Sequence, residues 1–252
     1  MRLLLTNDDG IYAPGIAALK SEIKSLGEIT ISAPDAERSA VGHSITLDRP
    51  LRVREVYVGN EFLGFGVDGS PADCVKIGIK EILKAAPDLV LSGINLGSNV
   101  GINVLYSGTV AAALEGAILG YTSIAVSLAA SKKPDFASAG RIAATVIKQI
   151  VDRKPVPGKL FNVNIPAIAP SEMKGVALAR QSTISYEDGF VVRTDPRGAK
   201  YFWMTGELHQ GRLAPDTDTA LLAEGYVTVT PLQYDLTDTK TLESSRDWNL
   251  RL

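Results

Sequence analysis

Side chains that carry oxygen atoms follow several of the apolar runs in this sequence. Asp8 and Asp9 come directly after the first run, Ser39 follows the second, and Asn95 and Asn99 follow the fourth. Oxygen atoms are the ligands that hard cations such as Mg²⁺, Mn²⁺ and Ca²⁺ prefer. Two adjacent carboxylates aimed at one point repel each other, and a cation between them removes that cost. The alternative is a solvated Asp-Asp-Gly turn, but the position of the pair after a buried strand favours a metal site.

A second group of residues has the character of an anion site. Residues 93–101 carry glycine at every fourth position, which lets the backbone approach a ligand closely. They match neither a dinucleotide fingerprint nor a P-loop, and a glycine-rich connection without a ligand is the alternative. Ser107, Gly108 and Thr109 then open a predicted helix, where backbone N–H groups and two hydroxyls favour an anion. Simple capping of the helix is the alternative there. Beside a cation, we predict a phosphate site.

Other reactive residue types suit structural roles better. Cys74 falls within a predicted helix and is expected in the core, and Asp73 is expected as a charge at the start of that helix. His43 lies in a polar loop, and its role is left open. One cysteine with His43 and His209 makes a zinc site improbable. The sequence contains no Gly-x-Ser-x-Gly elbow, which argues against a serine hydrolase.

Strands that alternate with helices must position these side chains. We expect strands at residues 3–5, 28–33, 62–67, 88–91, 123–128 and 160–165, and helices at 14–26, 71–84, 109–119 and 137–151. Ser70 and Pro71 suit the cap and the first position of the second helix. This alternation predicts the α/β class with a doubly wound, mostly parallel, Rossmann-like sheet. Such sheets bind ligands at the carboxyl ends of their strands.

The character of the chain changes after residue 170. Residues 184–204 are typical of hairpins, with turn signals at 187–189 and 195–198, and residues 226–230 form a further predicted strand. We therefore expect an α/β catalytic core at 1–170 and a smaller β-rich, hairpin-containing appendage at 171–252.

Composition limits the classes of partner. The chain has 26 basic and 28 acidic residues, and no run of Lys or Arg is longer than two, so we expect no long nucleic acid as a ligand. No window of eighteen apolar residues is present, so no membrane span is expected. The single cysteine and an N-terminus without a signal-peptide pattern favour the cytoplasm.

Several segments in order resemble the SurE (survival protein E) family of 5'(3')-nucleotidases. Order and spacing agree across the first 130 residues, and the C-terminal third agrees in character and at residues 216–218. The segments that carry the resemblance are Leu5-Thr6-Asn7-Asp8-Asp9-Gly10-Ile11, Ala33-Pro34-Asp35-Ala36-Glu37-Arg38-Ser39, residues 66–75, residues 92–101, and residues 106–116 from Tyr106-Ser107-Gly108-Thr109-Val110 to Glu115-Gly116.

The resemblance implies a site and a substrate class. It implies one divalent cation per subunit, Mg²⁺ or Mn²⁺ with Ca²⁺ also suited, held by Asp8, Asp9, Ser39 and Asn95. It implies phosphate contacts near Asn99, Ser107, Gly108 and Thr109. The implied activity removes phosphate from nucleoside 5'-monophosphates, with 3'-monophosphates and short polyphosphate as further substrates. The implied assembly is a homodimer or homotetramer built through the C-terminal part.

The chemistry of such a site favours water as the nucleophile, with Asp8 and Asp9 as the catalytic residues. A cation lowers the pKa of a bound water, whereas it weakens a carboxylate that it binds. We therefore expect attack by metal-bound water, with no general base identified. Two alternatives stay open: an aspartyl-phosphate on Asp8 or Asp9, and a nucleotide-binding module without turnover.

Overall fold

The apolar runs form one nine-stranded sheet in the computed structural model, which describes residues 1–184, 186–208 and 213–251. The six strands β4, β2, β1, β5, β6 and β7 are parallel, while β3 and β11 run antiparallel to β4 and β7. The predicted doubly wound, mostly parallel sheet is therefore confirmed. In the order of the sheet, the strands are β3 (Val53–Val58), β4 (Glu61–Val67), β2 (Glu28–Pro34), β1 (Arg2–Thr6), β5 (Leu89–Leu96), β6 (Ser123–Leu128), β7 (Leu160–Ile165), β11 (Val227–Leu232) and β8 (Val176–Leu178).

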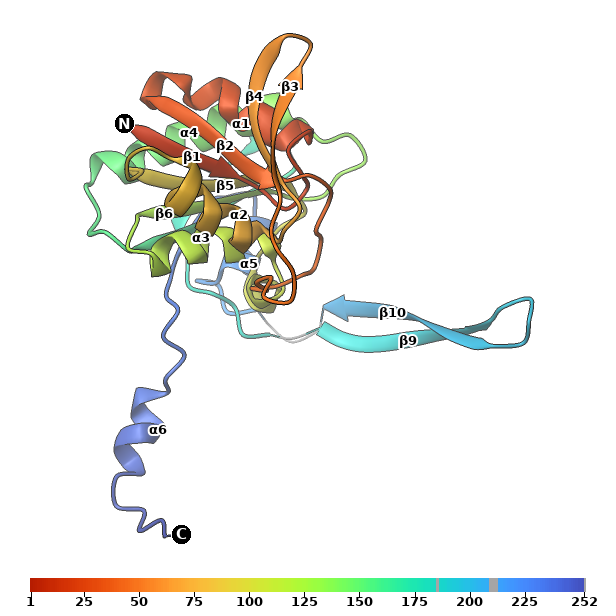
Figure 1. The fold of residues 1–252 in the computed structure, drawn as a ribbon. Coiled ribbons are helices and arrows are strands. Elements are labelled where there is room, and N and C mark those ends of the chain that lie inside the picture. The colour runs from red at the N-terminus through yellow and green to blue at the C-terminus, as the bar shows by residue number, and fades with distance from the viewer. Residues whose placement is uncertain (185, 209–212, 252) are drawn as a thin grey trace.

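Helices cover both faces of the sheet (Figure 1). On one face, α1 (Pro14–Ile23) packs against α4 (Phe136–Asp152), and on the other α2 (Pro71–Ile77) packs against α3 (Gly108–Ile118). Alternate residues of a strand point to opposite faces, so Leu3 and Leu5 join the core under α1 and α4 while Leu4 joins the core on the α2 side. Both faces of β1 are therefore buried, which explains its unbroken apolar run.

Local signals set the start of α2. Ser70 caps the helix by accepting from the backbone N–H of Asp73 at 3.1 Å, and Asp73 accepts in return from the Ser70 N–H at 2.9 Å. Pro71 occupies the first turn, as expected. The helix predicted for 71–84 is not one α-helix, because α2 ends at Ile77 and is followed by η2 (Gly78–Ile82), a π-helix with wider turns. The remaining short helices are η1 (Lys24–Leu26), η2 (Gly78–Ile82), η3 (Gly101–Leu105), η4 (Pro170–Glu172), α5 (Asp218–Ala223) and α6 (Thr239–Ser244).

One strand prediction was wrong in extent, and the edge strands β3 and β8 were not predicted. The strand expected at 88–91 continues as β5 to Leu96, where Asn95 and Leu96 pair with the end of β6. The glycines suggested a loop there, but Gly93 belongs to β5. Glycine is needed at this position because a Cβ would lie 2.4 Å from the Val126 carbonyl oxygen of the neighbouring strand. Strand β3 lies at the edge of the sheet with only Val56 buried, and its sequence Val-Arg-Glu-Val-Tyr-Val lacks the regular apolar–polar alternation that would have predicted a strand.

Residues 186–208 form a single long hairpin of β9 (Tyr186–Thr194) and β10 (Lys200–Leu208), which projects from the body (Figure 1). Its turn lies at 195–198, as predicted, where Asp195 accepts from the backbone of Arg197 and Ala199. The turn predicted at 187–189 is wrong, because Gly189 pairs with Thr205 within the ladder. Residue 185, within the segment expected to form hairpins, and His209 lie outside the described residues.

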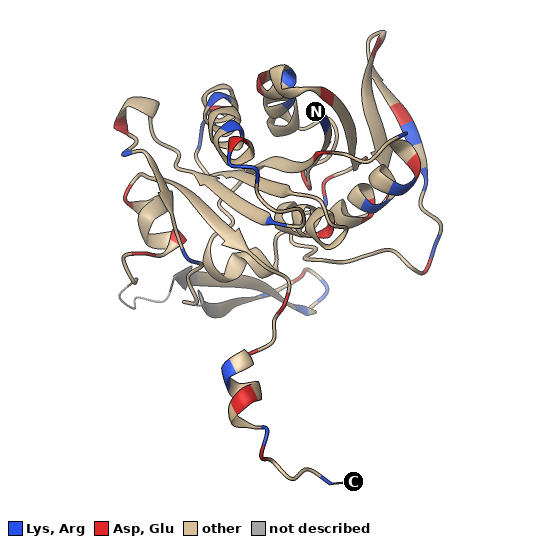
Figure 2. Cartoon of the chain, turned by 90° about the vertical axis from the view of Figure 1, so that its left-hand side faces the viewer, with Lys and Arg blue, Asp and Glu red and all other residues tan. Residues whose placement is uncertain are grey.

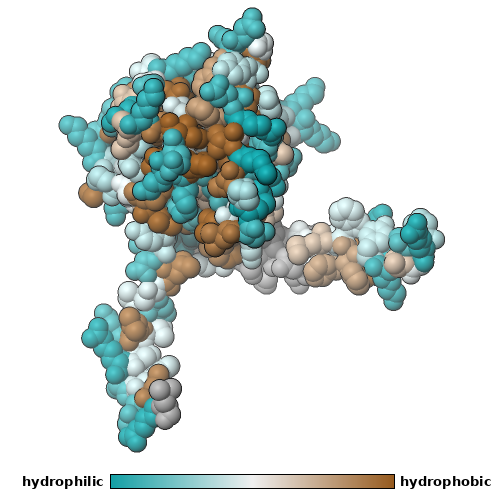
Figure 3. Space-filling model, viewed as in Figure 1, coloured by the Kyte–Doolittle hydropathy of each residue, from teal (hydrophilic) through white to brown (hydrophobic). Residues whose placement is uncertain are grey.

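The C-terminal part contributes to the main sheet as well as to the arm. Strands β11 and β8 extend the sheet beyond β7, whereas α6 and the end of the chain extend away from the body (Figure 1). The division at residue 170 therefore stays a prediction. The middle of the hairpin is apolar and its tip hydrophilic (Figure 3).

Acidic and basic residues are interspersed over the face seen in Figure 2, without a continuous basic stripe there. Among the described residues, no helix combines the length and the apolar character needed to cross a membrane.

Candidate active site

A cavity of about 240 Å³ opens at the carboxyl ends of β1 and β5. Because these strands are parallel, their carboxyl ends meet at one edge of the sheet. Of the site residues predicted from sequence, Asp8, Ser39, Asn95, Asn99 and Ser107 line this cavity, together with Ala40, Leu96, Asn103 and Tyr106. Asp9, Gly108 and Thr109 do not line it, but they follow Asp8 and Ser107 directly in the chain.

The turn after β1 presents the two aspartates. The Asn7 amide donates to the Gly10 carbonyl at 2.8 Å, and Gly10 has a φ of 98°, which favours glycine. The Asp8 carbonyl accepts from the backbone N–H of Arg38 at 2.8 Å, which joins this turn to the segment after β2. Asp8 is only 5% exposed. A solvated turn therefore does not describe Asp8, whose carboxylate is directed into the protein.

The beginning of α3 is packed against Asp8. The Thr109 hydroxyl donates to Asp8 Oδ1 at 2.5 Å, and Thr109 is fully buried. A Cβ on Gly108 would lie 2.9 Å from the Asp8 Cβ, so glycine permits this approach. Ser107 caps α3 by accepting from the Val110 N–H at 3.1 Å. Capping by Ser107 is therefore present, and the hydroxyl of Thr109 is already committed to Asp8.

Burial and like charge govern the two carboxylates. Burial raises the pKa of Asp8, and hydrogen bonds from Thr109 offset part of that rise. Burial first, and the Asp8 charge second, raise the pKa of Asp9 to about 6. Two neighbouring carboxylates that resist ionisation are the arrangement that a cation relieves.

The neutral donors complete a set suited to a hard cation. The Asn95 amide nitrogen donates to the Gly97 carbonyl at 2.7 Å, so the side-chain oxygen is the atom that Asn95 can offer to a ligand. Ser39 is exposed at the cavity, and its hydroxyl donates to Glu37 at 2.6 Å, which leaves oxygen lone pairs to coordinate. Two carboxylates, a hydroxyl and an amide oxygen fit Mg²⁺, Mn²⁺ or Ca²⁺ better than a soft metal.

Polar residues of β6 and β7 hold Asn99, and sequence reasoning missed them. The Asn99 amide donates to the Ser127 hydroxyl at 2.8 Å, and its backbone N–H donates to Asn164 Oδ1 at 2.8 Å. Asn162 and Asn164 in turn donate to the Asn99 carbonyl. Asparagine at alternate positions of an otherwise apolar strand was the available signal, because a buried amide requires partners.

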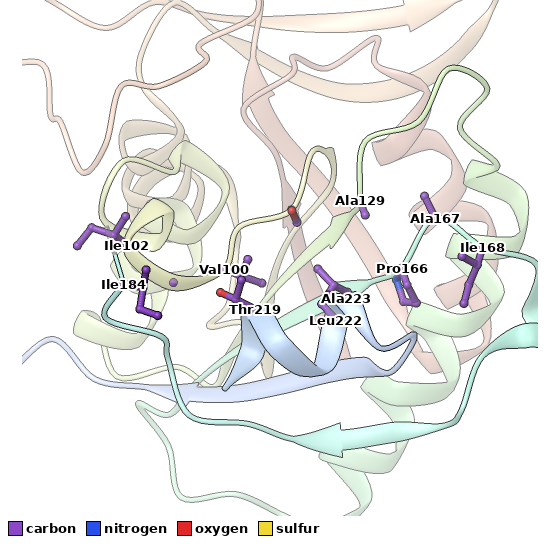
Figure 4. Close-up of a pocket in the computed structure, with 12 residues that line it drawn as sticks. Val100, Ile102, Ala129, Pro166, Ala167, Ile168, Ile184, Thr219, Leu222 and Ala223 are labelled. Carbon is purple, nitrogen blue, oxygen red and sulfur yellow. The ribbon is translucent and has the colours of Figure 1, made fainter. Parts of the chain in front are cut away.

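A second cavity, of about 300 Å³, lies beside residues 98–102 of the loop that follows β5 (Figure 4). It is lined by Ser98, Val100, Gly101 and Ile102 together with Thr219, Leu222 and other mostly apolar residues. None of its lining residues is ionisable. Of these two cavities, the one at β1 and β5 is therefore the one lined by a carboxylate, that of Asp8.

Comparison with known proteins gives consistent relatives. A family model described as survival protein SurE matches residues 3–188. The 5'-nucleotidase SurE of Syntrophus aciditrophicus is 48% identical over 238 residues, which cover 94% of this chain and 90% of that protein. The 5'-nucleotidase SurE of Pelotomaculum thermopropionicum is 49% identical over 245 residues, covering 96% and 93% respectively. The crystal structure of the SurE protein from Aquifex aeolicus has a TM-score of 0.85 at 40% identity and covers 97% of this chain and 98% of its own.

The raised pKa of Asp9 predicts how stability changes with pH in protein stripped of metal. Between the ordinary value of 3.8 and about 6, the folded protein holds a proton on Asp9 that the unfolded chain releases. Wild-type stability should therefore fall through this group as pH rises from about 4 to about 6. Asp9→Asn removes the ionisation, so its unfolding midpoint in EDTA should exceed that of the wild type at pH 7, and the gain should disappear below about pH 4.

Thermal unfolding between pH 4 and pH 8 measures this difference. Asp48→Asn, at an exposed aspartate, is the matched control and should show no such pH-dependent gain. A metal-free Asp9→Asn protein that is less stable than wild type at pH 7 would show that ionisation of Asp9 does not destabilise the folded protein.

Proposed function

The chain belongs to the survival protein SurE family, and from this premise we propose that it is a 5'-nucleotidase that hydrolyses nucleoside 5'-monophosphates to nucleoside and phosphate. The observation that carries the proposal is the single cavity shared by Asp8, Ser39, Asn95, Asn99 and Ser107. Relatives named 5'-nucleotidase SurE support the activity. Hydrolysis of 3'-monophosphates and short polyphosphate is a further part of this proposal.

We propose that one divalent cation per subunit is held by Asp8, Asp9, Ser39 and Asn95. The paired carboxylates and the neutral oxygen donors support this assignment. When bound, such a cation polarises phosphoryl oxygens and lowers the pKa of coordinated water. With only two charged ligands, the site suits Mg²⁺ or Mn²⁺, which keep part of their hydration.

The residues beside the cation are suited to the phosphate. The first N–H groups of α3 have no partner within the helix, and the helix dipole favours an anion there. Ser107 uses a lone pair for capping, so its hydroxyl proton remains able to donate to a phosphate oxygen. We assign phosphate contacts to Asn99, Ser107 and Gly108. Thr109 was predicted with them, but it donates its hydroxyl proton to Asp8, so we propose that it acts on the phosphate site by holding Asp8.

Water is the nucleophile that the contacts favour over Asp8. The Asp8 carboxylate accepts a hydrogen bond from Thr109 and is almost fully buried, so it is held in place with its charge partly neutralised. An aspartyl-phosphate on Asp8 or Asp9 is the alternative route. In this proposal both aspartates contribute by position and electrostatics, because they would hold the cation whose positive charge would attract the phosphate.

The exposed hairpin supports a proposed homodimer or homotetramer. Cross-strand pairing places Phe190, Val192, Phe202 and Met204 on one face of the hairpin, and each is at least 54% exposed. Trp203 and Val191 share the opposite face. An isolated two-stranded hairpin is marginal in water, and an exposed apolar patch marks an interaction surface. A second copy of the chain is therefore the proposed partner.

A cytoplasmic location stays a prediction from the single, buried Cys74.

The first test is release of inorganic phosphate from AMP in the presence of Mg²⁺ or Mn²⁺. Asp8→Asn and Asp9→Asn should each lower turnover by roughly 100-fold or more. Residues that only orient a metal ligand already contribute a factor of about 10–100 to activity, and the loss of a ligand itself should cost at least as much. Asp48→Asn should retain activity, and circular dichroism should show that all variants are folded. Full turnover by Asp9→Asn at limiting metal would contradict the assignment. Binding of AMP by wild type without phosphate release would favour a module without turnover.

The second test separates the two hydroxyls at the start of α3. Ser107→Ala should weaken competitive inhibition by inorganic phosphate by about 1–2 kcal/mol, the order of a lost hydrogen bond to a charged group. Thr109→Ala should weaken phosphate inhibition and also metal affinity, because its hydroxyl holds Asp8. Thr109→Ser keeps the hydroxyl and is the control. Unchanged phosphate inhibition in both alanine variants would refute the phosphate site.

The third test concerns assembly. The double variant Phe202→Glu, Met204→Glu places two charges on one face of the hairpin and should give a smaller species in size-exclusion chromatography with light scattering. Thr194→Glu adds a charge near the exposed turn and should leave the size unchanged. A wild-type protein that is monomeric at micromolar concentration would overturn the proposal.

A further inference from the structure

The segment that carries Ser39 has no regular secondary structure. Residues 35–52, between β2 and β3, form neither a helix nor a strand. No strand ladder therefore holds Ser39 at the cavity, and individual contacts must do so. Two contacts flank residues 39–45 of this segment. Before them, the Arg38 N–H donates to the Asp8 carbonyl, and after them, Thr46 donates to both carboxylate oxygens of Asp73.

Contacts to one buried carboxylate, that of Glu115, hold the middle of this segment. His43 Nε2 lies 2.8 Å from Glu115 Oε2, and Lys76 Nζ lies 2.5 Å from Glu115 Oε1. The Glu115 side chain is only 3% exposed, whereas that of His43 is 27% exposed. Nearby, the Gly42 N–H donates to the Tyr106 carbonyl at 3.1 Å.

The protonation of Glu115 and His43 follows from their contacts. Burial alone would raise the pKa of Glu115, but hydrogen bonds from His43 and Lys76 outweigh it, and the pKa lies below its usual range. An ionised carboxylate can only accept, so His43 Nε2 carries the proton of the bond. Both the neutral Nε2–H form and the imidazolium satisfy this requirement.

Helix α3 connects Glu115 to the proposed cation site. Thr109, in the first turn of α3, holds Asp8, and Glu115, about 9 Å further along the helix axis, holds His43. One rigid helix thus contacts both the strand end that carries the carboxylates and the irregular segment that carries Ser39. None of the proposed cation or phosphate contacts includes His43 or Glu115.

We propose that His43 is a positioning residue, which the buried Glu115 carboxylate holds so that the Ser39 segment stays against α3 and Ser39 faces Asp8. This inference rests on the proposed cation site. His43 touches neither the cation nor the substrate and acts through Ser39. Outer partners that orient metal ligands typically contribute a factor of 10–100 in metal affinity. The anchors at Arg38 and Thr46 remain when His43 is replaced, so the effect is local.

Calorimetric titration of Mn²⁺ into the metal-free protein tests this role without turnover. His43→Ala should raise the Mn²⁺ dissociation constant by about tenfold or more. His43→Gln should restore most of the affinity, because its amide N–H can reach Glu115 as Nε2–H does. Glu115→Ala should weaken Mn²⁺ binding as His43→Ala does, and the double variant should bind no more weakly than the weaker single variant, since both remove one interaction.

Arg54→Ala is the matched control. This variant removes the ion pair between Arg54 and Asp35. Asp35 is as far from Ser39 along the chain as His43 is, but the Arg54 side chain is 71% exposed. Exposed pairs contribute little, so Mn²⁺ affinity should be unchanged. If His43→Ala does not fold, His43→Asn serves instead, because its amide is too short to reach Glu115.

The outcomes separate this inference from the cation site itself. Asp9→Asn with wild-type Mn²⁺ affinity would overturn the cation site. Loss of Mn²⁺ affinity in Asp9→Asn with unchanged affinity in folded His43→Ala would overturn the positioning role alone. Equal losses in His43→Gln and His43→Ala would also overturn it, because the hydrogen bond would then not be the cause.

Discussion

The buried carboxylate of Asp8 is the constraint on which the site depends. A buried carboxylate is costly unless it is hydrogen-bonded or paired with a charge, and here the Thr109 hydroxyl supplies one partner. That bond requires the beginning of α3 to approach β1 closely, and glycine at position 108 permits the approach. The proposed phosphate contacts at Ser107 and Gly108 are thereby brought beside the proposed cation ligands. A single polar contact in the core therefore joins the two halves of the proposed chemistry.

Buried polar contacts extend this arrangement along the edge of the sheet. Asn99 is held by Ser127, Asn162 and Asn164, so the loop after β5 is attached to β6 and β7 rather than free. Asp218, which is fully buried, accepts from the backbone of Gly101 and of Ser182 at 2.9 Å each. The C-terminal part is thus bonded to the loop that lines the cavity. A buried polar group without a hydrogen-bond partner is costly, so loop conformations that break these hydrogen bonds are disfavoured.

The molecule separates chemistry from the surface proposed for assembly. The candidate active site lies at the sheet edge, where parallel strands converge and burial can perturb pKa values. The exposed apolar residues of the hairpin lie on an arm that projects from the body (Figure 1). Membership of the SurE family and similarity to a solved SurE structure over 97% of the chain are consistent with both parts belonging to one architecture.

Local pattern was sufficient for the central parallel strands, for the start of the helix capped by Ser70, and for a polar site after β1, since apolar periodicity, capping and turn chemistry act over a few residues. The convergence of Asp8, Ser39 and Asn95 followed from parallel strands, whose carboxyl ends meet at one edge. Tertiary structure alone decided the extension of β5 through Gly93, the pairing of Gly189 inside the hairpin, and the bonds of Asn99 to β7. It also decided that His43 meets Glu115, 72 residues away in the chain. Such contacts join residues distant in sequence, so local propensity does not encode them. They stabilise the protein only after the helices have packed on the sheet and brought the partners together.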